Sequence, residues 1–198
     1  MPEQDAIYDE LLETLRHAQR LGMLGAGSLE RAIERAGAFA EALPADTDEI
    51  VDLGSGGGLP GLVVAWRRPA ARLTLVDRRA ARTDALRRAV ARLRWTDRVE
   101  VVTADVVELA RGQWRQRFDA ATARGFGPPS WTLACGAAMV RVGGRVVISE
   151  PPARSGDRWN AEQVATLGVT RVDDSPAGLA VFQVDRPLAP HLPSRRAR

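Results

Sequence analysis

The part of this sequence best suited to bind a ligand is an acid followed at once by a cluster of glycines. Asp52 interrupts the apolar run 50–53, which is typical of a buried strand in a parallel sheet. Glycines allow the backbone to turn tightly and to approach a ligand closely. A buried strand, a glycine turn and an apolar segment that can form a helix predict the nucleotide-binding corner of a doubly wound α/β fold. The turn contains Gly54, Gly56, Gly57 and Gly58.

Two kinds of cofactor fit this corner, a dinucleotide and S-adenosylmethionine. Gly56, Gly58 and Gly61 match the G-x-G-x-x-G pattern of dinucleotide sites, which by itself is a weak signal. Asp52 precedes the first glycine by two residues. An anion there repels a pyrophosphate but suits a ligand with an ammonium and a sulfonium group, because opposite charges attract. The acid therefore favours S-adenosylmethionine over NAD.

A second acid, Asp77, closes the next predicted strand, 72–76. It follows Gly54 by 23 residues. In dinucleotide folds an acid about 20 residues after the glycine turn binds ribose hydroxyls. Asp77 is also well placed to cap the following helix, and the two roles are compatible.

The predicted helix 79–94 carries an apolar stripe and an opposite face rich in arginine. Eight arginines and only two acids occur between Arg78 and Arg98. Clustered cations of this kind bind the phosphates of nucleic acids, although a solvated surface is an equally open interpretation. The RNA-binding candidates are Arg78, Arg79, Arg82, Arg88 and Arg92.

The carboxyl ends of the fourth and fifth predicted strands supply the candidates for catalysis. The strands are 118–123 and 145–149, and the carboxyl ends of parallel strands face the ligand crevice. Arg124 and Phe126 are therefore expected where the substrate meets the methyl group. Glu150 is either a base or a structural acid.

Composition is that of one globular domain with few special features. The chain has 198 residues, of which 45% are hydrophobic and 27% charged, and a formal net charge of +3. A nucleic-acid surface must therefore come from local clustering. The acidic start lacks the pattern of a signal peptide, and no apolar run reaches the roughly 20 residues of a membrane helix. We expect a cytoplasmic protein without membrane contact.

The predicted elements arrange the chain in three parts. Residues 1–45 form two amphipathic helices that cap the sheet within the same domain. Residues 46–186 form the catalytic domain, and 187–198 a basic tail rich in proline and arginine. Five parallel strands followed by the hairpin 169–184 predict a doubly wound, Rossmann-like α/β sheet of seven strands, mostly parallel, with an antiparallel hairpin at the C-terminus.

Three motifs together resemble one family closely. The segment 52–61, DLGSGGGLPG, resembles the ribosomal RNA small-subunit guanine-N7 methyltransferases, also called the glucose-inhibited division protein B family. The segments 75–77 and 118–124 are similar to later motifs of that family in order and spacing. The resemblance covers roughly residues 10–185 and implies the class I S-adenosylmethionine-dependent methyltransferase fold.

The resemblance also implies roles for individual residues. Asp105 is expected to accept a hydrogen bond from the adenine amino group, with Val106 and Val107 flanking the ring. Arg124 is expected to reach the cofactor or the target base. The motifs and the resemblance together give these cofactor residues: Asp52, Gly54, Gly56, Gly58, Leu59, Asp77, Asp105, Val106, Val107 and Arg124.

The activity implied is methylation of guanine N7 in 16S rRNA by a monomer that needs no metal. N7 has a free lone pair, so the reaction requires no base, and holding the reactants in line supplies most of the catalysis. The partner is the small-subunit rRNA or a ribosomal particle. Three alternatives stay open: a methyltransferase for small molecules with Glu150 as base, a non-catalytic homologue that binds RNA or ribosomes, and a dinucleotide enzyme.

Overall fold

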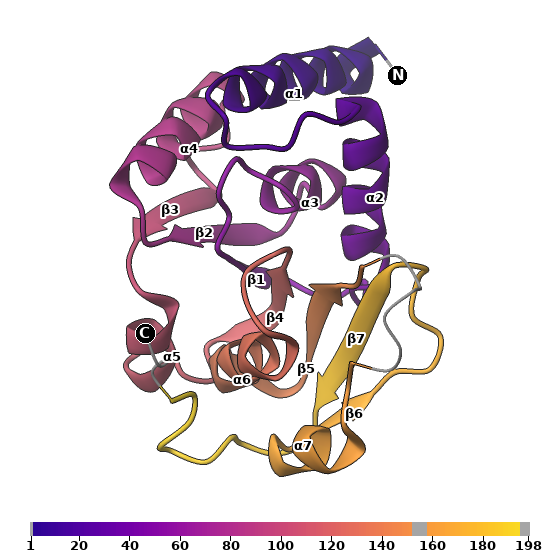
Figure 1. Cartoon of the computed structure of the whole chain (residues 1–198). Helices are drawn as coiled ribbons and strands as arrows, with labels where there is room; N and C mark the ends of the chain where they lie inside the picture. The colour runs from indigo at the N-terminus through magenta and orange to yellow at the C-terminus, as the bar shows by residue number, and fades with distance from the viewer. Residues whose placement is uncertain (1, 152–157, 195–198) are drawn as a thin grey trace.

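A seven-stranded sheet runs through the molecule with helices on both faces (Figure 1). The computed structural model describes residues 2–151 and 158–194. The strand order is β3-β2-β1-β4-β5-β7-β6; β1 to β5 are parallel, and β7 pairs antiparallel with both β5 and β6. This confirms the predicted fold class. The strands are β1 (Glu49–Leu53), β2 (Arg72–Asp77), β3 (Val99–Thr103), β4 (Phe118–Ala123), β5 (Val140–Ser149), β6 (Val169–Arg171) and β7 (Leu179–Val184).

The helices divide between the two faces of the sheet, and each face has its own apolar core. Residues of α1 to α4 belong to one core, and residues of α5 and α6 to the other. Along β1 the side chains alternate, because Ile50 enters the first core while Val51 and Leu53 enter the second. The helices are α1 (Pro2–Arg20), α2 (Leu29–Glu41), α3 (Gly61–Arg67), α4 (Ala80–Arg92), α5 (Val106–Arg111), α6 (Pro129–Met139) and α7 (Ala161–Thr166).

The two N-terminal helices share the core that lies under α3 and α4. Leu11 and Leu15 of α1 are fully buried, and Ile33 and Phe39 of α2 belong to the same cluster as the β1 side chain Ile50. Because this cluster is continuous with the sheet, α1 and α2 are held by the same hydrophobic burial as the rest of the fold. Among the helices that the structure describes, none is long and apolar enough to cross a membrane.

The structure differs from the sequence-based prediction between β4 and β5. The fifth strand was expected over residues 145–149, but β5 begins at Val140, directly after α6 ends at Met139. The register between β4 and β5 shifts near Phe118, and a Cβ on Gly144 would collide with the carbonyl oxygen of Asp119. Glycine thus allows the early part of β5 to pass close to β4, which sequence periodicity does not reveal.

Candidate cofactor and substrate site

A cavity of about 920 Å³ opens where β1, β2, β3 and β4 end. Its volume lies within the roughly 300–1,000 Å³ typical of small-molecule sites. It occupies the crevice at the carboxyl ends of the strands, where doubly wound folds bind ligands. The lining residues are Gly54, Asp77, Arg78, Arg79, Arg82, Ala104, Asp105, Val106, Val107, Glu108, Gly125, Phe126 and Trp131.

The glycine turn is hydrogen-bonded to the end of the neighbouring strand β2. Gly54 and Gly56 have φ values of +71° and +54°, a region that side chains other than glycine rarely adopt. The N–H of Ser55 donates to the carbonyl oxygen of Val76 at 2.9 Å, and the N–H of Gly56 donates to Oδ2 of Asp77 at 3.0 Å. The turn is therefore held rigidly, and its first glycine lines the cavity.

Asp77 connects the glycine turn to the start of α4. Its Oδ1 accepts the N–H of Arg79 at 2.9 Å, and Nη1 of Arg82 lies 3.5 Å from its Oδ2. The side chain is buried, yet it lines the cavity. The carboxylate of Asp77 thus orders the backbone before α4 and lies next to the ligand space, and its contact with ribose hydroxyls stays a prediction.

Asp52 is fully buried between β1 and β4, and it does not line the cavity. Oγ1 of Thr122 donates to its Oδ1 at 2.7 Å. Its Oδ2 lies beside Gly61 and has no hydrogen-bond partner of standard geometry among the described residues. Burial raises the pKa of Asp52 to about 6, although hydrogen bonds from Thr122 and Ser55 oppose the shift.

The structure shows an indirect role of Asp52 at the glycine turn, and a direct contact between Asp52 and the cofactor stays a prediction. The backbone carbonyl oxygen of Asp52 accepts a hydrogen bond from the Ser55 hydroxyl at 3.0 Å, and this bond helps to order the glycine turn. Three other residues of the glycine motif that were predicted to bind the cofactor also lie outside the lining of the cavity. Leu59 is part of the apolar core, and a Cβ on Gly58 would collide with Leu62. These three residues are Gly56, Gly58 and Leu59.

The start of α5 forms another wall of the cavity. Oδ1 of Asp105 accepts the N–H of Val107 at 2.8 Å and so caps the helix. Val106 and Val107 are buried apolar residues that line the cavity, and the other carboxylate oxygen of Asp105 has no hydrogen bond within the described residues. An apolar wall beside a free acceptor suits a purine ring with an exocyclic amino group.

Two aromatic rings form part of the wall beyond β4. Phe126 and Trp131 stack with their centroids 4.9 Å apart and an interplanar angle of 23°. Trp131 was not among the predicted site residues, although it follows Phe126 by only five residues. Its one sequence signal is its position in the first turn of the helix that follows the strand end. The pair offers flat surfaces for a base.

Arg124 follows β4 but does not line the cavity, contrary to expectation. Partial burial lowers the pKa of the Arg124 guanidinium, and the nearby charge of Arg35 lowers it further, whereas Asp52 raises it. The charges of Arg35 and Asp52 are therefore near enough to Arg124 to affect its pKa. A role toward the target stays a prediction.

Glu150 lies away from the cavity, and its contacts argue against a role as a base. Its Oε1 accepts Nε1–H of Trp159 at 2.6 Å, and its Oε2 pairs with Arg171 at 3.3 Å. Both oxygens therefore support the segment next to β6 and β7. The sequence could not distinguish the two roles because both partners come from a later part of the chain.

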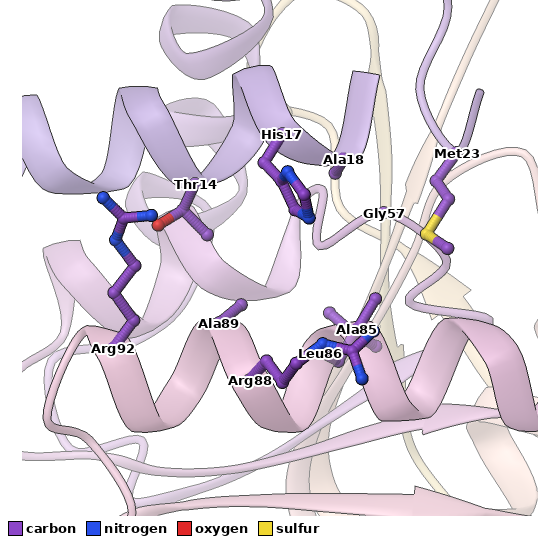
Figure 2. Close-up of a pocket in the computed structure, with 10 residues that line it drawn as sticks. All are labelled: Thr14, His17, Ala18, Met23, Gly57, Ala85, Leu86, Arg88, Ala89 and Arg92. Atoms are coloured by element: carbon purple, nitrogen blue, oxygen red, sulfur yellow. The ribbon is translucent and has the colours of Figure 1, made fainter. Parts of the chain in front are cut away.

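The predicted arginine face of α4 is divided between two cavities. Arg78, Arg79 and Arg82 line the large cavity at the start of the helix. Arg88 and Arg92 instead line a smaller pocket between α4 and α1 (Figure 2). A continuous basic surface was expected, but α1 packs beside the second half of α4. Among the described residues, no group of three His, Cys, Asp or Glu side chains could hold a metal ion.

Comparison with known protein families shows to which family the chain belongs. The sequence pattern of the family described as rRNA small subunit methyltransferase G matches residues 29–164. The chain belongs to this family. The family prediction is thereby confirmed, and the matched region contains the glycine turn, the acids Asp77 and Asp105 and the aromatic pair.

Relatives in this family are similar over most of the chain. Ribosomal RNA small subunit methyltransferase G of Frankia casuarinae is 30% identical over 184 residues, covering 85% of this chain and 68% of the relative. The protein of that name from Thermobifida fusca is 33% identical over 164 residues, covering 78% of this chain and 62% of the relative. The chain spans about two thirds of the length of these members of the family.

Solved structures agree on the fold. An S-adenosylmethionine-dependent O-methyltransferase from Thermotoga maritima aligns with a TM-score of 0.59 at 14% identity, over 93% of this chain and 73% of that one. An O-methyltransferase family protein from Burkholderia thailandensis aligns with a TM-score of 0.57 at 16% identity, over 94% and 60%. At such identities the likeness concerns the fold alone.

Proposed function

We propose that this member of the rRNA small subunit methyltransferase G family methylates N7 of a guanine in 16S rRNA, with S-adenosylmethionine as methyl donor. The observation that carries the proposal is that one cavity joins the glycine turn, the acids Asp77 and Asp105 and the Phe126–Trp131 stack. A nucleoside cofactor and a flat base require such surfaces side by side. Action on a ribosomal substrate would place the protein in the cytoplasm.

The residues of the cavity fit S-adenosylmethionine. Under the proposal, Asp77 binds the ribose hydroxyls, and Asp105 with the two valines of α5 binds the adenine, because all four residues line the cavity. Gly54 keeps the turn free of side chains where the methionine part would lie, and Asp52 supports that turn from beneath. When bound, the cofactor supplies an electrophilic methyl group on a sulfonium.

The target base would be bound at the aromatic side of the cavity. Proteins that read single-stranded RNA stack splayed bases on aromatic rings, and Phe126 and Trp131 offer such a surface. Arg78 and Arg79 are exposed and line the same cavity, so they are placed to contact phosphates beside the target. Stacking and phosphate contact together orient the base.

The chemistry requires orientation more than proton transfer. Guanine N7 attacks through a lone pair and carries no proton that must be removed. No histidine is among the residues that line the cavity. Proximity and alignment can supply roughly 7–11 kcal/mol of the barrier. The rigid turn and the aromatic stack perform this alignment under the proposal.

The first experiment is calorimetric titration of S-adenosylmethionine and its demethylated product into the protein, followed by methyl transfer to small ribosomal subunits and to naked 16S rRNA. We expect micromolar binding and one methyl group on a guanine, located by mass spectrometry of RNA fragments. Binding of RNA without methyl transfer to either substrate would contradict the proposal and favour a non-catalytic homologue. The contacts of Glu150 give no support to a small-molecule acceptor.

A further inference from the structure

A second pocket lies between α1 and α4, on the other side of the glycine turn from the cofactor cavity. Its volume is about 220 Å³, and it shares no lining residue with that cavity (Figure 2). Gly54 lines the large cavity, whereas Gly57 of the same turn lines the small one. The pocket is therefore a separate space attached to the cofactor-binding turn.

The walls of this pocket form an apolar slot. Small side chains face one another across it, with Ala18 on α1 and Ala85 and Ala89 on α4. The hydroxyl of Thr14 donates to the Glu10 carbonyl oxygen at 2.7 Å, so its hydrogen is directed at its own helix. A slot between two helices with small side chains admits a flat ring and makes few specific polar contacts with it.

The rim of the slot is cationic. Arg88 has no ion pair among the described residues, and its side chain is exposed. Arg92 pairs with Glu10 through Nε at 3.3 Å, and Figure 2 shows the His17 ring pointing from α1 toward α4. An apolar floor beside an unpaired guanidinium suits a planar group that carries an anion.

We propose that this pocket binds one nucleotide unit, with the base in the alanine slot and the phosphate on Arg88. The flexible thioether of Met23 closes one side and can adapt to different bases. The unit can come from a free mononucleotide or from an RNA strand. The second source rests on the proposed function, because it makes the nucleotide part of the rRNA substrate.

The geometry of α4 connects the two sites. Arg79 lines the cofactor cavity and Arg88 the second pocket, and nine residues of helix place them about 14 Å apart along its axis. Stacked nucleotides advance about 3.4 Å each, so about four nucleotides cover this distance. One strand can therefore place a target base in the cavity and another nucleotide in the slot.

The test measures binding while the demethylated cofactor product saturates the large cavity. The probes are guanosine 5′-monophosphate, followed by calorimetry, and a short fluorescent single-stranded RNA, followed by anisotropy. The variants are Arg88→Gln, which removes the cation, and Ala89→Leu, which fills the slot. Arg72→Gln is the control, because Arg72 is an exposed arginine at the opposite end of the sheet.

We expect Ala89→Leu to weaken binding about tenfold, as loss of a base contact does. Arg88→Gln should reduce the slope of log affinity against log salt for the RNA by about 0.7, the value for one phosphate on a single strand. Thermal unfolding and product binding identify a misfolded variant, and Arg88→Gln, at the surface, provides a second measurement if Ala89→Leu does not fold.

Each outcome either distinguishes the two sources of the nucleotide or contradicts the proposal that the pocket binds one. Weakened mononucleotide binding in both variants supports a site for free nucleotides, and weakened RNA binding alone supports a subsite for the strand. If neither probe distinguishes the variants from Arg72→Gln, the proposal is wrong. Methyl transfer by the unchanged protein is measured separately, so a failed pocket and a failed methyltransferase function give different results.

Discussion

The ring of Phe126 lies directly on Gly54, and a Cβ at that glycine would be 2.5 Å from Cδ2 of the ring. One residue belongs to the turn that would hold the cofactor, and the other to the stack that would hold the base. Their contact joins the two halves of the cavity. A side chain at position 54 would therefore displace the Phe126 ring.

We predict that Gly54→Ala lowers the affinity for S-adenosylmethionine at least tenfold. The added methyl group collides with Phe126, and the positive φ of +71° costs about 1–2 kcal/mol for a residue other than glycine. Titration calorimetry measures the affinity. Gly25→Ala is the matched control, since nothing lies within 4 Å of a Cβ there. Equal affinities in both variants would show that the turn tolerates a side chain.

Trp131→Ala should reduce methyl transfer to RNA and leave cofactor affinity within twofold. The substitution removes one ring of the stack, and a stacked base contributes about 1–3 kcal/mol to binding. Steady-state kinetics with small subunits would show mainly a raised KM. Trp131→Phe keeps a ring and should recover most of the loss. If the phenylalanine variant is as impaired as the alanine variant, stacking is not the role of this residue.

The buried carboxyl of Asp52 predicts a pH-dependent stability difference between the wild type and Asp52→Asn. Its pKa rises from 3.8 to about 6 on folding, so the folded state holds a proton that the unfolded state releases in this interval. The free energy of unfolding of the wild type should therefore fall, relative to Asp52→Asn, as pH rises from about 4 to about 6, by on the order of 2–3 kcal/mol. Above that range the difference should be constant.

Urea denaturation at several pH values measures this difference. Parallel curves for the two proteins would mean that Asp52 is already ionised in the folded state at low pH.

We predict that replacing Asp119 lowers the stability of the fold without a direct effect on the cavity. Its Oδ2 accepts the N–H groups of Asp48 and Glu49 at 2.8 and 2.9 Å, and its Oδ1 pairs with Arg141 at 3.0 Å. Asp119→Ala leaves donors without partners, at about 1–3 kcal/mol for each buried group. Thermal denaturation should show a lower midpoint, with cofactor affinity retained below it. Asp173→Ala, on an exposed loop, should change little.

Glu150→Gln should leave methyl transfer within about twofold of the wild type. Glutamine can still accept the Trp159 indole N–H and loses only the partly exposed ion pair with Arg171, and such pairs contribute about 0–1 kcal/mol. Initial rates with small subunits at equal cofactor occupancy provide the measurement. A folded variant with a large loss of rate would restore Glu150 as a candidate base.

The sequence by itself determined the fold class, the family and the chemical type of the site. A strand pattern followed by glycines at fixed spacing depends on local backbone conformation, and so Gly54, Asp77 and Asp105 could be placed at strand ends before the structure was known. The apolar periodicity of α1, α2 and α4 was equally local. These features are decided by neighbours in the chain.

Only the tertiary structure decided which side chains share a cavity. Asp52 and Leu59 belong to the motif but face the interior, because Thr122 of β4 and the core under α3 surround them. Through packing between segments distant in sequence, α1 divides the arginines of α4 between two pockets. Trp131 follows Phe126 by only five residues, but only the fold shows that the two rings stack and line the cavity. Side-chain direction at such places follows from burial against other elements, which no local pattern encodes.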